Sequence, residues 1–249
     1  MLVQHRADAV HLISQNDHAL VSGEMARMWR GVTPSPTPPS IEAVLAIALH
    51  DAAWIGVDAE LPIDPKTELP YDFQSLPSIR KLEVYAAGID AIEAVQPYAA
   101  LLVSMHYGAF VAQKDHPIFH ANERQRRQRL SAGFANRFEE AAVSRDFALL
   151  RLLDVLSLRL CLTAPGTLEE HLPRWLMSPM QWDGAELRMA WKDEDECVIA
   201  PFPFHHPFEV AIPFDRRARG SVSSTGTDVA RGTGSELARG TWRMRIASA

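Results

Sequence analysis

The architecture of this chain is set by the stretch Phe147-Ala-Leu-Leu-Arg-Leu-Leu-Asp154-Val-Leu-Ser-Leu158. It forms the middle of a strongly apolar segment, residues 146–163, which predicts a central, buried helix. An aspartate on the apolar face of a buried helix is costly unless positive charge compensates it. Asp154 therefore predicts a metal ion or a group of protonated histidines in the core. Steps of three and four residues place four other side chains on the same helix face as Asp154, namely Phe147, Leu150, Ser157 and Cys161.

A second helix is predicted over residues 40–49, and it ends on an adjacent histidine and aspartate. Ser40 is a typical helix-capping residue. His50 and Asp51 stand at the C-terminal end. Apolar residues recur at helical spacing after the cap, which predicts a buried stripe of Ile41, Val44, Leu45, Ala48 and Leu49.

Two further histidines lie at the ends of predicted helices. His18 starts a helix that stops before Gly31, and His106 ends a helix whose first turn begins at Pro97. Imidazole and carboxylate groups are ligands for Mn²⁺, Fe²⁺, Zn²⁺ or Mg²⁺, and helical bundles commonly place such groups from different helices together. We therefore expect a divalent-metal site, with His106 and Asp51 as the catalytic groups. Its predicted ligands are His18, His50, Asp51 and Asp154.

Each of these residues also has a structural interpretation without a ligand. The helix dipole favours a histidine at a C-terminus, which would leave the neighbouring aspartate solvated. A histidine can also pack in a core or neighbour a capping residue. In these alternatives, the helix dipole favours His50 while Asp51 is solvated, and His18 is only a neighbour of the capping residue Asp17. His106 packs on Tyr107 and Phe110, and Asp154 bonds to Arg151, Arg159 or a tryptophan.

Residues 57–80 are rich in proline and aspartate and have few periodic positions. They predict a long ordered loop, and loops of that length in a compact domain usually act as lids or binding segments. We expect this loop to cover a pocket for a small-molecule substrate or ligand. The residues expected to contact that molecule are Trp54, Asp58, Tyr71 and Ser157.

The pattern changes after Pro165, where short alternating stretches predict two to four antiparallel strands. Residues 2–14 predict a hairpin or a single edge strand. We therefore expect a mainly α fold, a helical bundle with a small antiparallel β portion. The expected organisation is one domain over 1–214, in which the β-containing part 165–214 packs on the helices, then a weakly ordered segment 215–249 with a possible final strand at 241–246.

Composition excludes several classes of function. The formal net charge is -6, and a nucleic-acid binder needs a concentrated basic surface. The basic run Arg124–Arg129 is interpreted as a solvated helix face. Cys161 and Cys197 have no zinc-finger spacing, which indicates a reducing compartment. No signal peptide and no apolar run of membrane-spanning length is visible, so we expect a cytoplasmic protein that binds neither membranes nor nucleic acid, with no prediction of oligomeric state.

The order His18, His50-Asp51, Asp154 resembles the signature of the HD superfamily of helical, metal-dependent phosphohydrolases. This resemblance implies an HD-like helical bundle and a metal-dependent hydrolase, with phosphoesters as substrates by analogy. One alternative is a protein that binds a metal or small ligand without turnover. Another is a structural protein whose histidines are core residues.

Several short motifs follow one another along the chain, among them Asp17-His-Ala19, Leu49-His-Asp51, Pro70-Tyr-Asp-Phe73, Leu153-Asp-Val-Leu-Ser-Leu158 and Pro201-Phe-Pro-Phe204. Taken in order, they resemble a bacterial family known as domain-of-unknown-function family 3891. The resemblance extends to about residue 214, and it implies that the histidines and aspartates matter together, without implying an activity.

Overall fold

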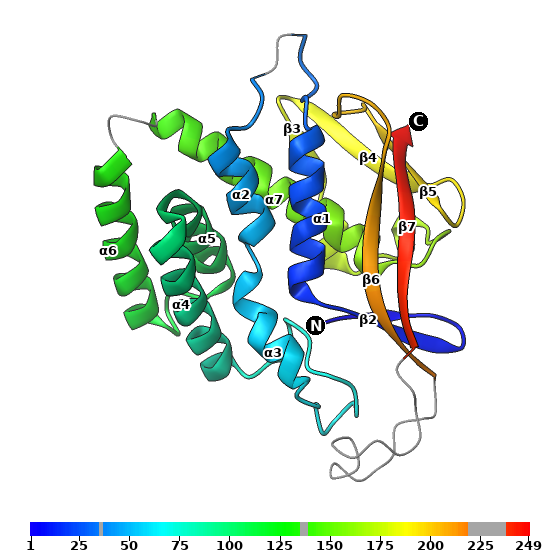
Figure 1. The fold of residues 1–249 in the computed structure, drawn as a ribbon, viewed down its shortest axis with the longest axis horizontal. Coiled ribbons are helices and arrows are strands. Elements are labelled where there is room, and N and C mark those ends of the chain that lie inside the picture. Colours follow the sequence, from blue (N-terminus) through cyan, green and yellow to red (C-terminus); the bar gives the residue numbers. More distant parts are fainter. Residues whose placement is uncertain (35–36, 135–138, 219–237) are drawn as a thin grey trace.

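The computed structural model describes residues 1–34, 37–134, 139–218 and 238–249. Helices pack on one side of a seven-stranded, mixed sheet that curves into a half-barrel (Figure 1). Helices make up 50% of the described residues and strands 22%, so this is an α/β fold. The predicted mainly α, HD-like helical bundle is therefore wrong. The strands of the sheet come from both ends of the chain, and alternation within each strand gives no sign that they share a sheet.

The helices begin where capping chemistry predicts. The hydroxyl of Ser14 accepts the N–H of Asp17 and that of Ser40 accepts the N–H of Ala43, while Pro97 occupies a first turn. The α-helices are α1 Gln15–Met28, α2 Ile41–Leu49, α3 Ile55–Glu60, α4 Ser78–Val95, α5 Pro97–Phe110, α6 Pro117–Phe134 and α7 Glu140–Leu162. The short 3₁₀ helices are η1 Ala52–Trp54, η2 Glu169–His171 and η3 Arg174–Leu176.

The sheet has the order β1-β2-β6-β7-β5-β4-β3. The N-terminal hairpin of β1 and β2 is present, but β5 and β7 run parallel, so the sheet is not purely antiparallel as predicted. The strands are β1 Leu2–His5, β2 Ala9–Ile13, β3 Met180–Trp182, β4 Ala185–Trp191, β5 Glu196–Ala200, β6 Phe208–Ala218 and β7 Ala238–Ser248.

The segment for which weak order was predicted, 215–240, lies mostly outside the described residues, which omit 219–237. Its described ends belong to β6 and β7. β7 covers the predicted last strand at 241–246 and occupies the middle of the sheet, paired with β6 and β5.

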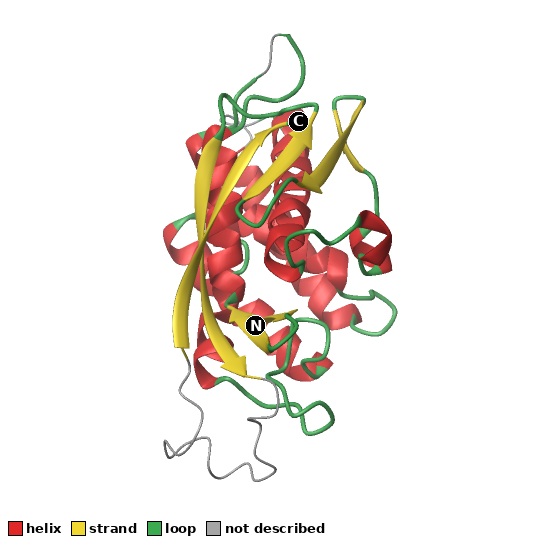
Figure 2. Cartoon of the chain, turned by 90° about the vertical axis from the view of Figure 1, so that its right-hand side faces the viewer, coloured by secondary structure: helices red, strands yellow, loops and turns green. Residues whose placement is uncertain are grey.

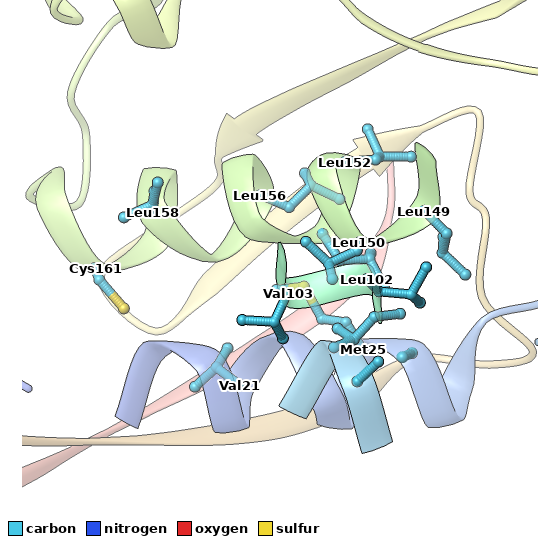
Figure 3. Close-up of a cluster of buried hydrophobic side chains, with 14 of the residues drawn as sticks. Val21, Met25, Leu102, Val103, Leu149, Leu150, Leu152, Leu156, Leu158 and Cys161 are labelled. Carbon is cyan, nitrogen blue, oxygen red and sulfur yellow. The ribbon is translucent and has the colours of Figure 1, made fainter. Parts of the chain in front are cut away.

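The core lies between α7, α1 and α5, and the sheet covers α1 and α7 from one side (Figure 2). Leucines of α7 face Val21 and Met25 of α1 and Leu102 and Val103 of α5 (Figure 3). The prediction of a central helix is confirmed, although α7 already begins at Glu140. The helix predicted over 121–145 is instead α6, which ends at Phe134.

The buried face of α2 differs from the predicted stripe. Ile41 is 77% exposed, and the other stripe residues are only partly buried. Every residue of α2 except Glu42 is apolar, so several faces show helical spacing and the sequence could not select among them. The face that is buried consists of Ala43, Ala46, Ile47 and His50.

The loop predicted over 57–80 is shorter, because α3 extends to Glu60 and α4 begins at Ser78. Leu61 ends α3 with a left-handed backbone conformation, φ 49°. Residues 61–77 are irregular except for a single β-bridge between Ile63 and Pro70. Among the described residues, no helix is long and apolar enough to cross a bilayer.

Candidate metal centre

The structure gathers five residues named by the sequence analysis into one buried group, called the His/Asp cluster below. The three histidines are 0–2% exposed, and the two aspartates are 5% and 7% exposed. They come from four helices that surround the core. The members are His18 in the first turn of α1, His50 at the C-terminal cap of α2, Asp51 directly after it, His106 in α5 and Asp154 in α7.

The Nε2 atoms of all three histidines face the two carboxylates. His18 Nε2 lies 2.9 Å from Asp51 Oδ2 and 4.0 Å from Asp154 Oδ1. His50 Nε2 lies 3.3 Å from Asp154 Oδ1 and 3.9 Å from Asp51 Oδ2. His106 Nε2 lies 3.8 Å from Asp154 Oδ2. Nitrogen and oxygen donors thus lie close to one another in the interior.

These separations can be compared with those of metal ligands. Two atoms that each bind one ion at about 2.0–2.2 Å lie roughly 3.0–3.5 Å from each other. The separations of His50 and His106 from Asp154, 3.3 and 3.8 Å, are within or a few tenths of an ångström beyond that range. His50 Nε2 also has no hydrogen-bond partner among the described residues, although it is fully buried. The donor set therefore fits a metal ion after small side-chain rotations.

The second ring nitrogen orients two of these histidines. His50 Nδ1 donates to the carbonyl of Ile47 at 2.7 Å. His18 Nδ1 lies 2.9 Å from the hydroxyl of Ser157, which itself donates to the carbonyl of Asp154, so Nδ1 is the donor. Such contacts fix ring orientation and leave Nε2 as the ligand atom, as is usual at protein metal sites.

The donors form two groups of three that share His50. One is His18, His50 and Asp51, and the other is His50, His106 and Asp154; the ligand atoms within each group lie within 4.8 Å of one another. The Nε2 of His50 has a single lone pair and its Nδ1 is bonded to Ile47, so His50 can serve one ion only. The two groups therefore cannot each bind an ion through His50.

Charge in the cluster is balanced between the groups. Burial lowers the pKa of His50, but Asp51 and Asp154 outweigh it and raise that pKa to about 9. Burial raises the pKa of Asp154, but His50 and His106 lower it to about 2, and the neighbouring histidines also lower the pKa of Asp51. Burial lowers the pKa of His106 to about 4. At neutral pH these shifts keep Asp51 and Asp154 ionised, His50 protonated and His106 neutral.

The alternatives without a ligand are only partly consistent with this geometry. Asp51 is buried, so the interpretation of a solvated aspartate beside a dipole-favoured histidine is wrong. His106 does pack edge-on against Phe110, with ring centroids 4.7 Å apart, and still presents Nε2 to Asp154. Arg159 donates to the carbonyls of Leu176 and Ser178.

The predicted substrate-contacting residues lie in different surroundings. The hydroxyl of Ser157 contacts Nδ1 of His18, whereas the carboxylates lie at Nε2. Trp54 is buried with its ring edge toward Tyr85, and Tyr71 is partly buried on the loop. Asp58 binds the N-terminal amine of Met1 at 2.5 Å and the backbone N–H of Gln15 at 2.6 Å, so its carboxylate is already engaged outside the cluster.

Two neighbours of the cluster were missed by the sequence analysis. Ser22 donates to the hydroxyl of Ser157 at 2.8 Å. Ser22 follows His18 by four residues, and this spacing predicts that the two side chains share one helix face. Tyr107 is fully buried with its ring stacked on Tyr85. Consecutive helix residues point in different directions, so no spacing rule connects Tyr107 with the cluster.

Comparison with known proteins gives one family. The model of DUF3891, described as a protein of unknown function, matches residues 1–216. No curated protein and no solved structure matches the chain. The match includes every residue of the His/Asp cluster and ends before β7.

Proposed function

We propose that this chain, which belongs to the DUF3891 family, binds one divalent metal ion in the His/Asp cluster and uses it to hydrolyse a small phosphoester-type substrate. The single observation that supports metal binding best is the convergence of three Nε2 atoms on two buried carboxylates. Two carboxylates buried together need positive charge beside them, and a divalent ion supplies it.

The donor set favours a transition metal. Three imidazoles and two carboxylates suit Zn²⁺, Fe²⁺ or Mn²⁺ better than Mg²⁺, which prefers oxygen ligands and retained water. When bound, such an ion polarises a phosphoryl or carbonyl oxygen and lowers the pKa of a bound water.

The residues of this chain have separate parts in the proposal. His18 and His50 hold the ion through Nε2, with Ser157 and the Ile47 carbonyl fixing their rings. Asp51 and Asp154 supply negative charge. His106 is neutral because burial lowers its pKa to about 4, so when Nε2 faces the ion its one proton sits on Nδ1. His106 thus offers the ion a neutral nitrogen ligand.

The choice of a phosphoester rests on the order His, His-Asp, Asp and on analogy, since the fold is not a helical bundle. One observation favours a second candidate, a protein that binds metal without turnover. All five side chains are at least nine-tenths buried, and a site closed by protein ligands leaves little room for substrate.

The first test is metal content. Chelator-treated protein is offered Mn²⁺, Fe²⁺ and Zn²⁺ in turn, desalted, and analysed by mass spectrometry for bound metal. We expect about one ion per chain, and at least tenfold weaker binding by His50→Ala and Asp154→Asn. No binding by the wild-type chain, or equal binding by these variants, contradicts the metal centre.

Asp146→Asn is the matched control. Asp146 is a buried aspartate of the same helix, and its carboxylate accepts the hydroxyl of Tyr98 at 2.6 Å instead of facing the cluster. This variant should keep its metal. Circular dichroism of each variant separates loss of ligand from loss of fold.

The second test is turnover. Metal-loaded protein is assayed against phosphate monoesters, diesters and nucleotides. Metal-dependent hydrolysis that Asp154→Asn abolishes supports the hydrolase. Binding of one ion with no turnover of any ester selects the non-catalytic metal-binding protein.

A further inference from the structure

The His/Asp cluster is closed to solvent, so a metal ion needs a way in. Its three histidines are at most 2% exposed, and its two aspartates are at most 7% exposed. Protein interiors are packed about as densely as organic crystals, so an ion reaches such a site only when side chains move aside. The neighbours of the three histidine rings indicate which side chains these are.

The Nδ1 atoms of His18 and His50 face the interior of the protein. His18 Nδ1 contacts the hydroxyl of Ser157, and His50 Nδ1 donates to the backbone carbonyl of Ile47. Ser157 and Ile47 are both 0% exposed. Behind these two rings the cluster is therefore backed by packed core.

His106 differs, because one of its neighbours reaches solvent. Phe110 follows His106 by four residues in α5, and helical side chains lean back toward the helix N-terminus, so the two share one face. Their rings meet edge-on, with centroids 4.7 Å apart and planes at 86°. Phe110 is 62% exposed, whereas the other side chains that the structure describes in contact with the three histidine rings are buried. Phe110 thus lies between the cluster and water.

His106 is also the least restrained of the three histidines. Its Nδ1 is buried and has no hydrogen-bond partner among the described residues. Its Nε2 lies 3.8 Å from Asp154 Oδ2, farther than the nearest carboxylate oxygens of His18 and His50, at 2.9 and 3.3 Å. A hydrogen bond at the second nitrogen fixes the orientation of a histidine ring, so its absence leaves the His106 ring easier to turn. Turning outward gives that nitrogen water as a partner, which offsets part of the cost of opening.

Phe110 stands where movement is easiest. It is the last residue of α5, and Val111 continues the chain in an extended conformation, with φ −100° and ψ 122°. Helix ends open at lower cost than helix centres, and exposed side chains change rotamer rapidly. A ring in this position can leave His106 without disturbing the core.

We propose that Phe110 is a gate, whose ring closes the route by which a metal ion reaches the His/Asp cluster. The route opens when Phe110 swings away and the His106 ring turns outward. This inference rests on the proposed metal centre and adds how that centre is loaded. A gate changes the rates of entry and exit together and leaves the affinity nearly unchanged, because Phe110 is not a ligand of the ion.

The first test measures the rates of metal uptake and release by stopped flow. A fluorescent indicator reports the transfer of Zn²⁺ to chelator-treated protein, and an excess of strong chelator then draws the ion out. The strength of an edge-on ring pair corresponds to a factor of roughly two to ten in a rate. We expect Phe110→Ala to be faster in both directions by that factor, with an affinity within about twofold of wild type. Phe110→Leu, which retains part of the cover, should lie between the two.

Leu20→Ala is the matched control. Leu20 is 48% exposed and lies on α1 two residues after His18, and residues two apart in a helix do not face each other. It is therefore a large, exposed apolar residue that is near a cluster histidine in sequence and does not cover it. Its uptake and release rates should equal those of wild type.

A second measurement needs no metal. Diethyl pyrocarbonate modifies neutral histidine rings that solvent reaches, and peptide mapping gives the rate at each histidine. The exposed His205 serves as the internal reference. Relative to it, His106 of the metal-free protein should react roughly two- to tenfold faster in Phe110→Ala than in wild type.

Uptake, release and modification rates of Phe110→Ala that equal those of wild type overturn the inference. So does an affinity loss that comes from faster release alone, because Phe110 then supports the site instead of closing it. A wild-type chain that takes up no metal contradicts the proposed function, and the modification of His106 then decides the inference by itself.

Discussion

At the scale of single residues, Asp154 and His50 explain why the cluster should exchange a proton for a metal. In the metal-free protein the carboxylates hold a proton on His50, whose pKa is raised to about 9. An ion that binds Nε2 must displace that proton, because a ring nitrogen cannot hold both. In the proposed metal centre, the proton on His50 would therefore compete with the ion.

This competition predicts the pH dependence of binding. Below pH 9 the proton is present and must be released, so metal affinity should rise about tenfold per pH unit and level off above pH 9. A histidine with an ordinary pKa would level off above about 6.5. Competition with a chelator of known affinity, measured with Mn²⁺ from pH 6.5 to 9.5, distinguishes the two. A flat affinity between pH 7 and 9 contradicts the raised pKa of His50.

The sequence was most informative about single residues of the cluster. An aspartate on an apolar helix and a histidine–aspartate pair at a helix end are local features, and the structure places them together. Asp58 shows the limit of such reasoning. Its carboxylate is bonded to Met1 and Gln15, which lie more than forty residues away in the sequence. Nothing in its neighbourhood in the sequence indicates those partners.

At the scale of elements, the approach of α1 to α2 positions His18 and His50. Gly23 of α1 faces α2, and a Cβ added there would lie 2.6 Å from the Cβ of Ala48 and 3.1 Å from its Cα. The two helices therefore pack closely because Gly23 has no side chain. Capping residues and Pro97 located helix starts correctly, whereas the buried face of α2 could not be predicted from spacing within a helix that is almost wholly apolar.

Gly23→Ala should therefore separate α1 from α2. We expect a loss of about 1–3 kcal/mol in the free energy of unfolding, measured by urea denaturation, together with weaker metal binding. Gly56→Ala in α3 is the control, because an added Cβ there meets nothing within 4 Å. It should be neutral or stabilise by up to about 1 kcal/mol, since alanine favours helix more than glycine does. Equal stability of the two variants would show that the close approach is unimportant.

At the scale of the whole molecule, the sheet joins both ends of the chain. β2 pairs with β6, and β7 lies between β6 and β5 in the middle of the order. Pairing between strands two hundred residues apart leaves no mark in either strand, so the sequence predicted individual strands and missed the sheet. For this reason the sequence predicts a helical bundle, although it locates most of the helices.

Because β7 is central in the sheet, deleting this strand should disturb folding far more than shortening the segment that precedes it. Removing residues 219–249 takes away the central strand, and we expect the product to lose its cooperative thermal transition. Replacing only 219–237 by a turn of about four residues keeps the register in which Arg216 pairs with Ala238, and this variant should fold and bind metal. Calorimetry of both proteins checks the prediction. A cooperative transition in the product without β7 contradicts the central role of that strand.

The central claim is that His18, His50, Asp51, His106 and Asp154 together hold one metal ion. The most direct measurement is anomalous diffraction from crystals of the metal-loaded protein, recorded on both sides of the absorption edge of the metal. We predict one peak per chain inside the cluster, about 2.0–2.3 Å from His50 Nε2 and an oxygen of Asp154. Crystals that show no anomalous peak among these five side chains, while surface sites take up the same metal, would contradict the claim.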